Sequence, residues 1–189
     1  EIRSAIQDET IIISIIAGLP TSWLSNALQT SRIVRVMPNT PCLIGRGVSA
    51  ITFPPELKTS DVNTIQKLFT TVGVVHSVPE SMLDAITAVS GSGPGYVALL
   101  IDALADGGVQ AGLPRPLALD LAVQTFAGTA SLIAETGDHP AVVKDRVSSP
   151  GGTTVAGLSV LERKGVRGAL ADAVAAAAAR SSVLARSVT

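Results

Sequence analysis

The sequence contains few of the residues that build most metal and nucleophilic sites. It has one cysteine, Cys42, and two histidines, His76 and His139. One cysteine excludes an internal disulfide and a thiolate zinc site, and the histidines have no i,i+4 partner, so we expect no metal site. The net charge is −1 and no Lys/Arg cluster stands out. Nucleic acid is therefore not an expected partner.

Aromatic residues and charges are also scarce. Aromatics make up 3% of the chain and charged residues 15%, against 47% hydrophobic residues, so the core must be aliphatic. No apolar run of about 20 residues is uninterrupted, and no basic-plus-apolar leader begins the chain, which predicts a soluble cytoplasmic protein. So much apolar content with so little charge predicts that another subunit covers part of the surface.

The first eighty residues alternate between strand and helix patterns. Its β-branched runs predict strands, and Gly or Pro ends each run. After two of these runs the apolar residues have helical spacing, which predicts a helix. Thr21 is expected to cap the first helix, and Ser60 or Asp61 the second. The strands are predicted at residues 10–18, 32–37, 47–53 and 72–78.

After Pro79 only helices are expected, so the sequence predicts two domains, 1–79 and 80–189. The helix at 116–136 is apolar on nearly every side, which favours an intertwined dimer over a monomeric bundle. The predicted helices are 83–89, 94–111, 116–136, 139–147, 150–164 and 166–186.

The motif SSPGGTT, residues 148–154, predicts an anion site. If Pro150 lies in the first helical turn, the next backbone amides are free and the helix dipole attracts a small carboxylate. A plain helix cap is the alternative, but two adjacent glycines in a first turn cost about 1 kcal/mol each relative to alanine, which favours a ligand. The expected donors are Ser149, Gly151, Gly152, Thr153 and Thr154.

Two further motifs are weaker. SGSGPGY, residues 90–96, lacks the context of a dinucleotide fingerprint or a nucleophile elbow, and predicts a tight turn that begins a long helix. MPNTP, residues 37–41, ends a predicted parallel strand, where open α/β sheets bind ligands. Asn39 and Thr40 are candidates there, with a rigid connecting loop as an equal alternative. Ala17 and Gly18 end the neighbouring strand in the same way.

Together MPNTP, AVSGSGPGY, ALADGGVQAGLPR and KDRVSSPGGTT closely resemble pyrroline-5-carboxylate reductase, from about residue 10 to the end. That family makes L-proline by NAD(P)H-dependent reduction of a cyclic imine. The resemblance implies α/β followed by all-α: the C-terminal part of a Rossmann-type sheet, then a helical dimerisation domain. It also implies a homodimer through the helical domain that can assemble further.

The resemblance also assigns roles to residues. Glu80 matches a position associated with substrate or product, and Arg146 matches a cofactor contact of some relatives. Because the cofactor, NADP(H) or NAD(H), supplies the hydride, no protein nucleophile is needed. Ser149, Gly152, Thr153 and Thr154 would hold the substrate carboxylate and ring nitrogen, with Thr154 on the nitrogen as the catalytic candidate, and Ala17, Pro38, Asn39 and Thr40 would face the nicotinamide.

One departure from the family pattern leaves alternatives open. The family begins with a strand and G-x-G-x-x-[AG], which this sequence lacks. We therefore expect weak or absent cofactor binding by these residues alone, and the sequence gives no basis for choosing NADH or NADPH. A related imine or β-hydroxyacid reductase is a second possibility. A hydroxyacid enzyme should use a lysine as acid, and only Lys144 and Lys164 lie beyond residue 79. A non-catalytic helical dimerisation module is the third.

Overall fold

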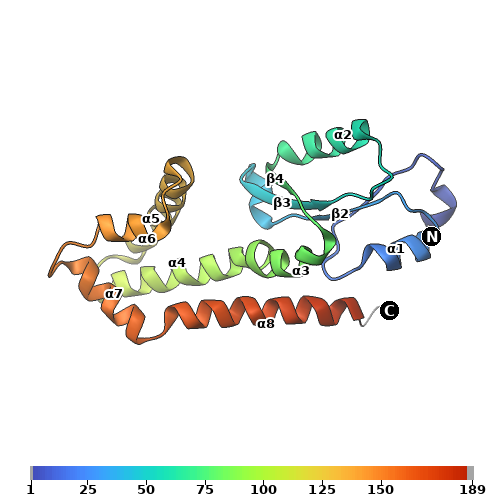
Figure 1. Cartoon of the computed structure of the whole chain (residues 1–189). Helices are drawn as coiled ribbons and strands as arrows, with labels where there is room; N and C mark the ends of the chain where they lie inside the picture. The colour runs from blue at the N-terminus through green and yellow to red at the C-terminus, as the bar shows by residue number, and fades with distance from the viewer. Residues whose placement is uncertain (1, 187–189) are drawn as a thin grey trace. The chain divides into compact units, whose positions relative to one another are not determined.

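The computed structural model describes residues 2–186 (Figure 1). The chain forms two compact units. We call Glu1–Pro94 with Asp172–Thr189 the sheet unit, and Gly95–Ala171 the helical unit. The predicted domains, 1–79 and 80–189, divide the chain where strands give way to helices, and they stay a prediction.

The sheet unit contains four strands in the order β1-β2-β3-β4. β1 pairs parallel with β2, β2 antiparallel with β3, and β3 parallel with β4. The predicted α/β pattern is confirmed, with a first strand shorter than expected. Its elements are η1 (Ile2–Ala5), β1 (Ile12–Ser14), α1 (Thr21–Leu28), β2 (Ile33–Met37), η2 (Thr40–Ile44), β3 (Gly47–Thr52), α2 (Thr59–Thr70) and β4 (Gly73–Ser77).

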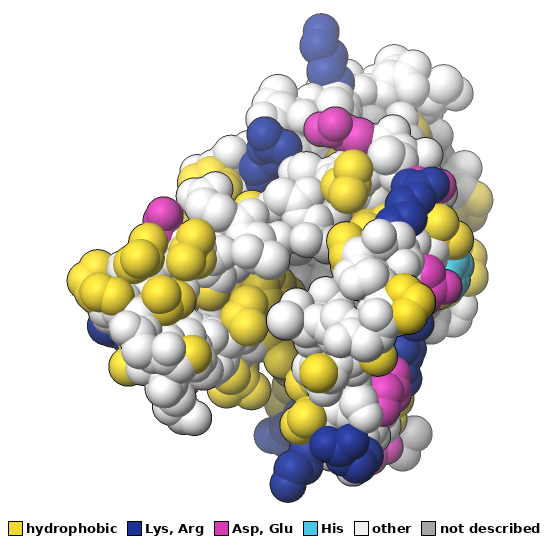
Figure 2. All heavy atoms as spheres, turned by 90° about the vertical axis from the view of Figure 1, so that its left-hand side faces the viewer, with side chains coloured by type: hydrophobic (Ala, Val, Ile, Leu, Met, Phe, Trp, Pro, Cys, Tyr) yellow, Lys and Arg dark blue, Asp and Glu magenta, His cyan; other side chains and the backbone are white. Residues whose placement is uncertain are grey.

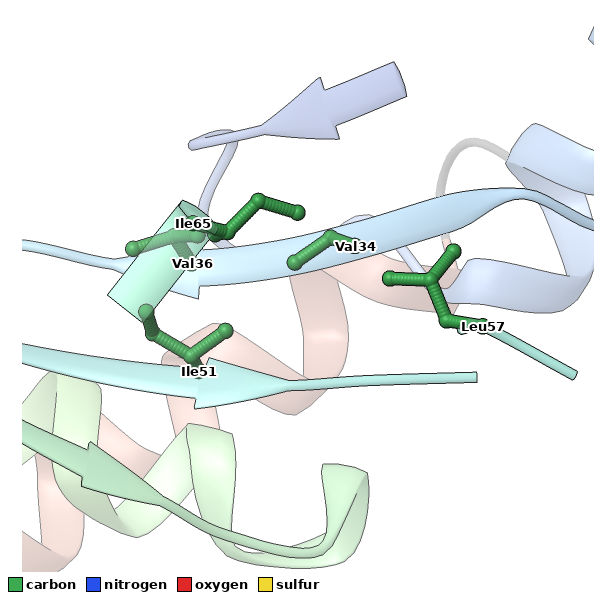
Figure 3. Close-up of a cluster of buried hydrophobic side chains, with 5 residues drawn as sticks. All are labelled: Val34, Val36, Ile51, Leu57 and Ile65. Carbon is green, nitrogen blue, oxygen red and sulfur yellow. The ribbon is translucent and has the colours of Figure 1, made fainter. Parts of the chain in front are cut away.

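Helices α1 and α2 lie on opposite faces of the sheet (Figure 1), and alternate side chains of β2 point to each face. Val34 and Val36 pack with Ile51, Leu57 and Ile65 on the α2 side, and Figure 3 shows this cluster. On the other side Ile33 packs with Leu19 and Leu24 of the α1 region. By the same alternation Arg35 and Met37 share the face of Ile33.

The helix starts in this unit differ from those predicted. α1 begins at Thr21, but no side chain caps it locally and Pro20 is the N-cap residue. α2 begins at Thr59 after Lys58, so neither Ser60 nor Asp61 caps it. Instead, the Asp61 carboxylate accepts a hydrogen bond from Arg32 at 3.1 Å. A partner that distant in sequence is invisible to local capping rules.

Three short elements follow β4: η3 (Glu80–Met82), α3 (Leu83–Ile86) and the π-helix η4 (Thr87–Gly91). The single helix predicted at 83–89 is therefore only partly right. The Asp84 carboxylate accepts hydrogen bonds from the Ser181 and Ser182 hydroxyls, at 2.6 and 2.8 Å. These hydrogen bonds join the C-terminal turns of α8 (Val166–Arg186) to α3. Ser181 is only 3% exposed, so its bond is shielded from water.

The helical unit is built around small residues. Ala105, Ala118 and Ala122 are buried between α4 and α5, and a Cβ on Gly108 would lie 3.1 Å from that of Ala118. Arg115 binds Asp102 and Asp106 at the surface of this hairpin. All five helices predicted after residue 93, including the short one at 139–147, are present: α4 (Gly93–Gln110), α5 (Arg115–Thr136), α6 (Pro140–Arg146), α7 (Thr153–Arg163) and α8.

Much of α5 is apolar and uncovered in the single chain. Leu117, Leu121 and Leu132 are each 46–48% exposed, and Figure 2 shows hydrophobic side chains gathered on the side of the chain that carries α5 to α7. By length and composition, Glu80–Gln110 and Arg115–Thr136 could each cross a membrane, and only 11% of each apolar window is buried. Such helices are covered either by partner helices or by lipid.

Candidate functional site

The SSPGGTT segment forms a turn before its helix. The Gly152 amide donates to the Ser149 carbonyl at 3.0 Å, and Gly151 has a φ of +69°. Proline second and a left-handed glycine third is the pattern of a type II turn. α7 then begins at Thr153 with Gly152 as N-cap. The predictions that Pro150 lies in the first helical turn, and that the helix starts there, are wrong because the turn hydrogen bond comes first.

The amides of the first turn of α7 are unpaired. The N–H groups of Thr153, Thr154 and Val155 have no acceptor among residues 2–186, and no side chain caps the helix. These amides point out of the positive end of the helix dipole. The expectation of a free amide therefore holds for Thr153, whereas that of Gly152 is used in the turn.

Gly152 instead provides space. A Cβ at this position would lie 2.4 Å from the Ser149 hydroxyl oxygen. Thr154 is half-buried, while Ser149 and Thr153 are exposed. We call residues 149–154 the cradle. In the single chain it is an open surface site that offers amides and small hydroxyls.

Residues beside the cradle are engaged with one another. The Ser148 hydroxyl donates to the Lys144 carbonyl at 2.7 Å, and Arg146 pairs with Asp138. The His139 Nδ1 accepts the Ala141 amide at 3.2 Å and so caps α6. His139 therefore has a structural role.

The MPNTP loop lies in the sheet unit, directly after β2. The Asn39 side-chain oxygen accepts the Val48 amide at 2.8 Å, which closes the loop and leaves the Asn39 NH2 group available. Thr40 is exposed, and its hydroxyl has no partner in the described part of the chain. Ala17 is exposed beside Gly18, which turns with a φ of +73°.

Glu80 is held by two donors. Its Oε1 accepts the Thr21 amide at 2.7 Å and an Arg35 Nη1 hydrogen at 2.7 Å. Burial raises the pKa of the carboxyl, but the hydrogen bonds from Thr21 and Arg35 and the charge of Arg35 outweigh it, so the pKa is lowered. Sequence reasoning missed Arg35, although an arginine inside the apolar run RIVRVM was an available signal.

The sequence-predicted residues thus fall into two groups. Ala17, Pro38, Asn39, Thr40 and Glu80 belong to the sheet unit, and the cradle belongs to the helical unit. No group of three or more His, Cys, Asp or Glu side chains able to hold a metal occurs in residues 2–186. The available chemistry is that of hydroxyls, amides and one ionised carboxylate, which suits binding and orientation of a small polar ligand.

Comparisons with known proteins identify the family. The family "Pyrroline-5-carboxylate reductase dimerisation" matches residues 80–184. The pyrroline-5-carboxylate reductase of Synechocystis sp. is 51% identical over 92% of this chain, which spans 65% of that relative's length. The Arabidopsis thaliana enzyme is 46% identical over 99% of the chain and 68% of the relative. The chain thus spans about two thirds of these relatives.

Solved structures show the same fold. The Coxiella burnetii reductase superposes with a TM-score of 0.89 at 33% identity, covering 97% of this chain and 69% of that one. The Plasmodium falciparum pyrroline carboxylate reductase, solved with NADP bound, gives a TM-score of 0.87 at 35% identity, covering 93% and 71%. The resemblance seen in the four sequence motifs is confirmed, and the chain belongs to the pyrroline-5-carboxylate reductase family.

Proposed function

We propose that the protein reduces 1-pyrroline-5-carboxylate to L-proline by hydride transfer from NAD(P)H, the last step of proline biosynthesis. The observation that carries this proposal is the set of unpaired amides at the start of α7, beside the hydroxyls of Ser149 and Thr154. The substrate is a small carboxylate, and such an anion is what a free helix N-terminus attracts.

The cradle holds the substrate at two points. The amides of Thr153 and Thr154, with Gly151 and the Ser149 hydroxyl, bind the carboxylate, and the Thr154 hydroxyl hydrogen-bonds the ring nitrogen. A protonated imine is already electrophilic, so orientation by Thr154 replaces a strong general acid. Glu80 is a further substrate or product contact in this proposal, through Oε2, which has no partner among residues 2–186.

The cofactor is NADP(H) or NAD(H), and bound nicotinamide supplies the hydride. Ala17 and the loop of Pro38, Asn39 and Thr40 lie beside its nicotinamide end in this proposal. The free Asn39 NH2 group and the Thr40 hydroxyl suit a polar ring substituent. NADP is bound in the Plasmodium falciparum relative, which supports this assignment without deciding between the two cofactors.

The functional unit is a homodimer through the helical unit, with higher assembly possible and a cytoplasmic location. The dimerisation family covers α4 to α7 and most of α8. It therefore favours partner helices, rather than lipid, as the cover for the exposed leucines of α5.

Isothermal titration with L-proline tests the cradle. Thr154→Ala should weaken proline binding at least about tenfold, because hydrogen bonds to charged groups contribute about 1.5–3 kcal/mol. Ser159→Ala is the matched control, since Ser159 lies farther along α7 and binds Arg163. Equal affinity in both variants would overturn the assignment. No proline binding by a dimeric wild-type protein would favour the non-catalytic dimerisation module.

A β-hydroxyacid reductase is less well supported. Lys144 pairs with Asp145 at 3.0 Å, and Lys164 is the C-cap of α7, at the end opposite the cradle. This alternative would be supported if the protein oxidised a 3-hydroxyacid and lost that activity when Lys144 or Lys164 was replaced.

A further inference from the structure

A buried guanidinium lies in the centre of β2. Arg35 is 8% exposed, between Val34 at 0% and Val36 at 3%. A buried charge is costly unless it is paired and hydrogen-bonded. In the described part of the chain, its one charged partner is Glu80, at 2.7 Å. Because burying a guanidinium in β2 costs folding free energy, a function that Arg35 serves would explain its presence there.

The Glu80 oxygen that binds Arg35 also accepts the Thr21 amide. One atom thereby joins three segments of the sheet unit. Arg35 lies three residues before Pro38, Thr21 lies four residues after Ala17, and Glu80 begins the region matched by the dimerisation family. The two loops assigned to the nicotinamide are thus tied to the same carboxylate.

We propose that Arg35 is a positioning residue for the cofactor. The Arg35–Glu80–Thr21 link holds the Ala17 loop and the Asn39–Thr40 loop at a fixed separation, and so sets affinity for the nicotinamide cofactor without contacting the substrate. This inference rests on the proposed function. β2 suits the role because it is the most buried strand, and the lowered pKa keeps the Glu80 carboxylate charged near neutral pH.

The test compares Arg35→Met, Arg35→Lys and Arg32→Met in the full-length enzyme. Arg35→Met removes the ion pair and leaves the Glu80 carboxylate and its bond to Thr21 in place. Arg32→Met is the control, because Arg32 precedes the same strand but binds Asp61. We expect Arg35→Met to weaken NADPH binding, measured by fluorescence titration, about 2- to 30-fold, the range of indirect coupling through packed networks.

The expected pattern separates positioning from simple destabilisation. Arg35→Lys should recover part of the NADPH affinity that Arg35→Met loses, and Arg32→Met should bind NADPH normally. Glu80→Gln keeps an oxygen for the Thr21 amide but loses the charge. Its effect on NADPH binding should not add to that of Arg35→Met, because both variants remove the same Arg35–Glu80 ion pair.

Three outcomes would overturn the inference: unchanged NADPH affinity in Arg35→Met, additive effects in the double variant, or an equal loss in Arg32→Met. If Arg35→Met does not fold, Arg35→Lys and Glu80→Gln carry the same measurement. Failure of the proposed function is distinct. The wild-type enzyme could bind NADPH, and the variants could show the expected pattern, while pyrroline-5-carboxylate is not reduced. That result would refute the proposed function and leave the positioning role of Arg35 intact.

Discussion

Replacing Gly152 by alanine should disable the cradle with little effect on the fold. Gly152 has an extended backbone, φ −76° and ψ 169°, which any residue adopts, so alanine brings no backbone strain. The new Cβ would lie 2.4 Å from the Ser149 Oγ and 3.0 Å from its carbonyl oxygen. Ordinary contacts begin near 3.4 Å. The hydroxyl must therefore move by about 1 Å and the carbonyl by a few tenths of an ångström.

The two displacements have different costs. Ser149 is exposed, so its hydroxyl can turn away, and the rearrangement should cost about 1 kcal/mol of folding stability. The turned hydroxyl no longer reaches the carboxylate. One hydrogen bond to a charged group contributes about 1.5–3 kcal/mol, so proline affinity should fall roughly 10- to 150-fold.

The assay is the inhibition constant of L-proline together with kcat/KM for the imino acid. Gly157→Ala is the matched control, since Gly157 lies inside α7 and a Cβ added there would have no atom within 4 Å, and alanine favours a helix there. Proline inhibition within twofold of wild type in Gly152→Ala, with an unchanged fold, would refute the placement of the substrate carboxylate in the cradle.

Three more predictions concern stability. The Glu80 pKa lies below its ordinary value of 4.5, so the ionised carboxylate stabilises the folded protein above pH 4.5. This stabilisation is lost as the pH falls through the folded-state pKa. The Tm should therefore decline more steeply in acid for the wild type than for Glu80→Gln. Asp84→Ala should lower the free energy of unfolding in urea by roughly 2–4 kcal/mol, because the buried Ser181 hydroxyl loses its acceptor. Asp84→Asn keeps an acceptor and should lower it much less, so equal losses in the two variants would contradict this prediction. Ala118→Leu should lower stability by about 1–3 kcal/mol through overpacking against Gly108, and an unchanged Tm would contradict the close approach of α4 and α5.

Local patterns predicted the elements well and their partners poorly. β-branched runs located all four strands, and Gly and Pro located the helices after residue 93, because period and punctuation are local properties. The cap of α1 could not be predicted, since it comes from Glu80, fifty-nine residues from Thr21. Pro150 misled because proline suits both a first helical turn and the second position of a type II turn.

The candidate site shows the same division. Ser149 and Thr154 stand out because small hydroxyls beside two glycines are unusual at the start of a helix. Arg35 gives a weaker signal: its place in an apolar run is visible, but its partner Glu80 lies 45 residues further along the chain. Which amides of the cradle are free also depended on the turn hydrogen bond of Gly152, which only the backbone geometry reveals.

The contact between Asp84 and the end of α8 has a consequence for biosynthesis. Its hydrogen bonds join residues 97 and 98 positions apart, so they cannot form on the ribosome until Ser181 and Ser182 have emerged from the exit tunnel. α3 and the end of α8 are therefore joined only after every intervening helix has been translated. Chaperone contact with α3 should accordingly persist on nascent chains that have passed Asp84 but not yet released Ser182.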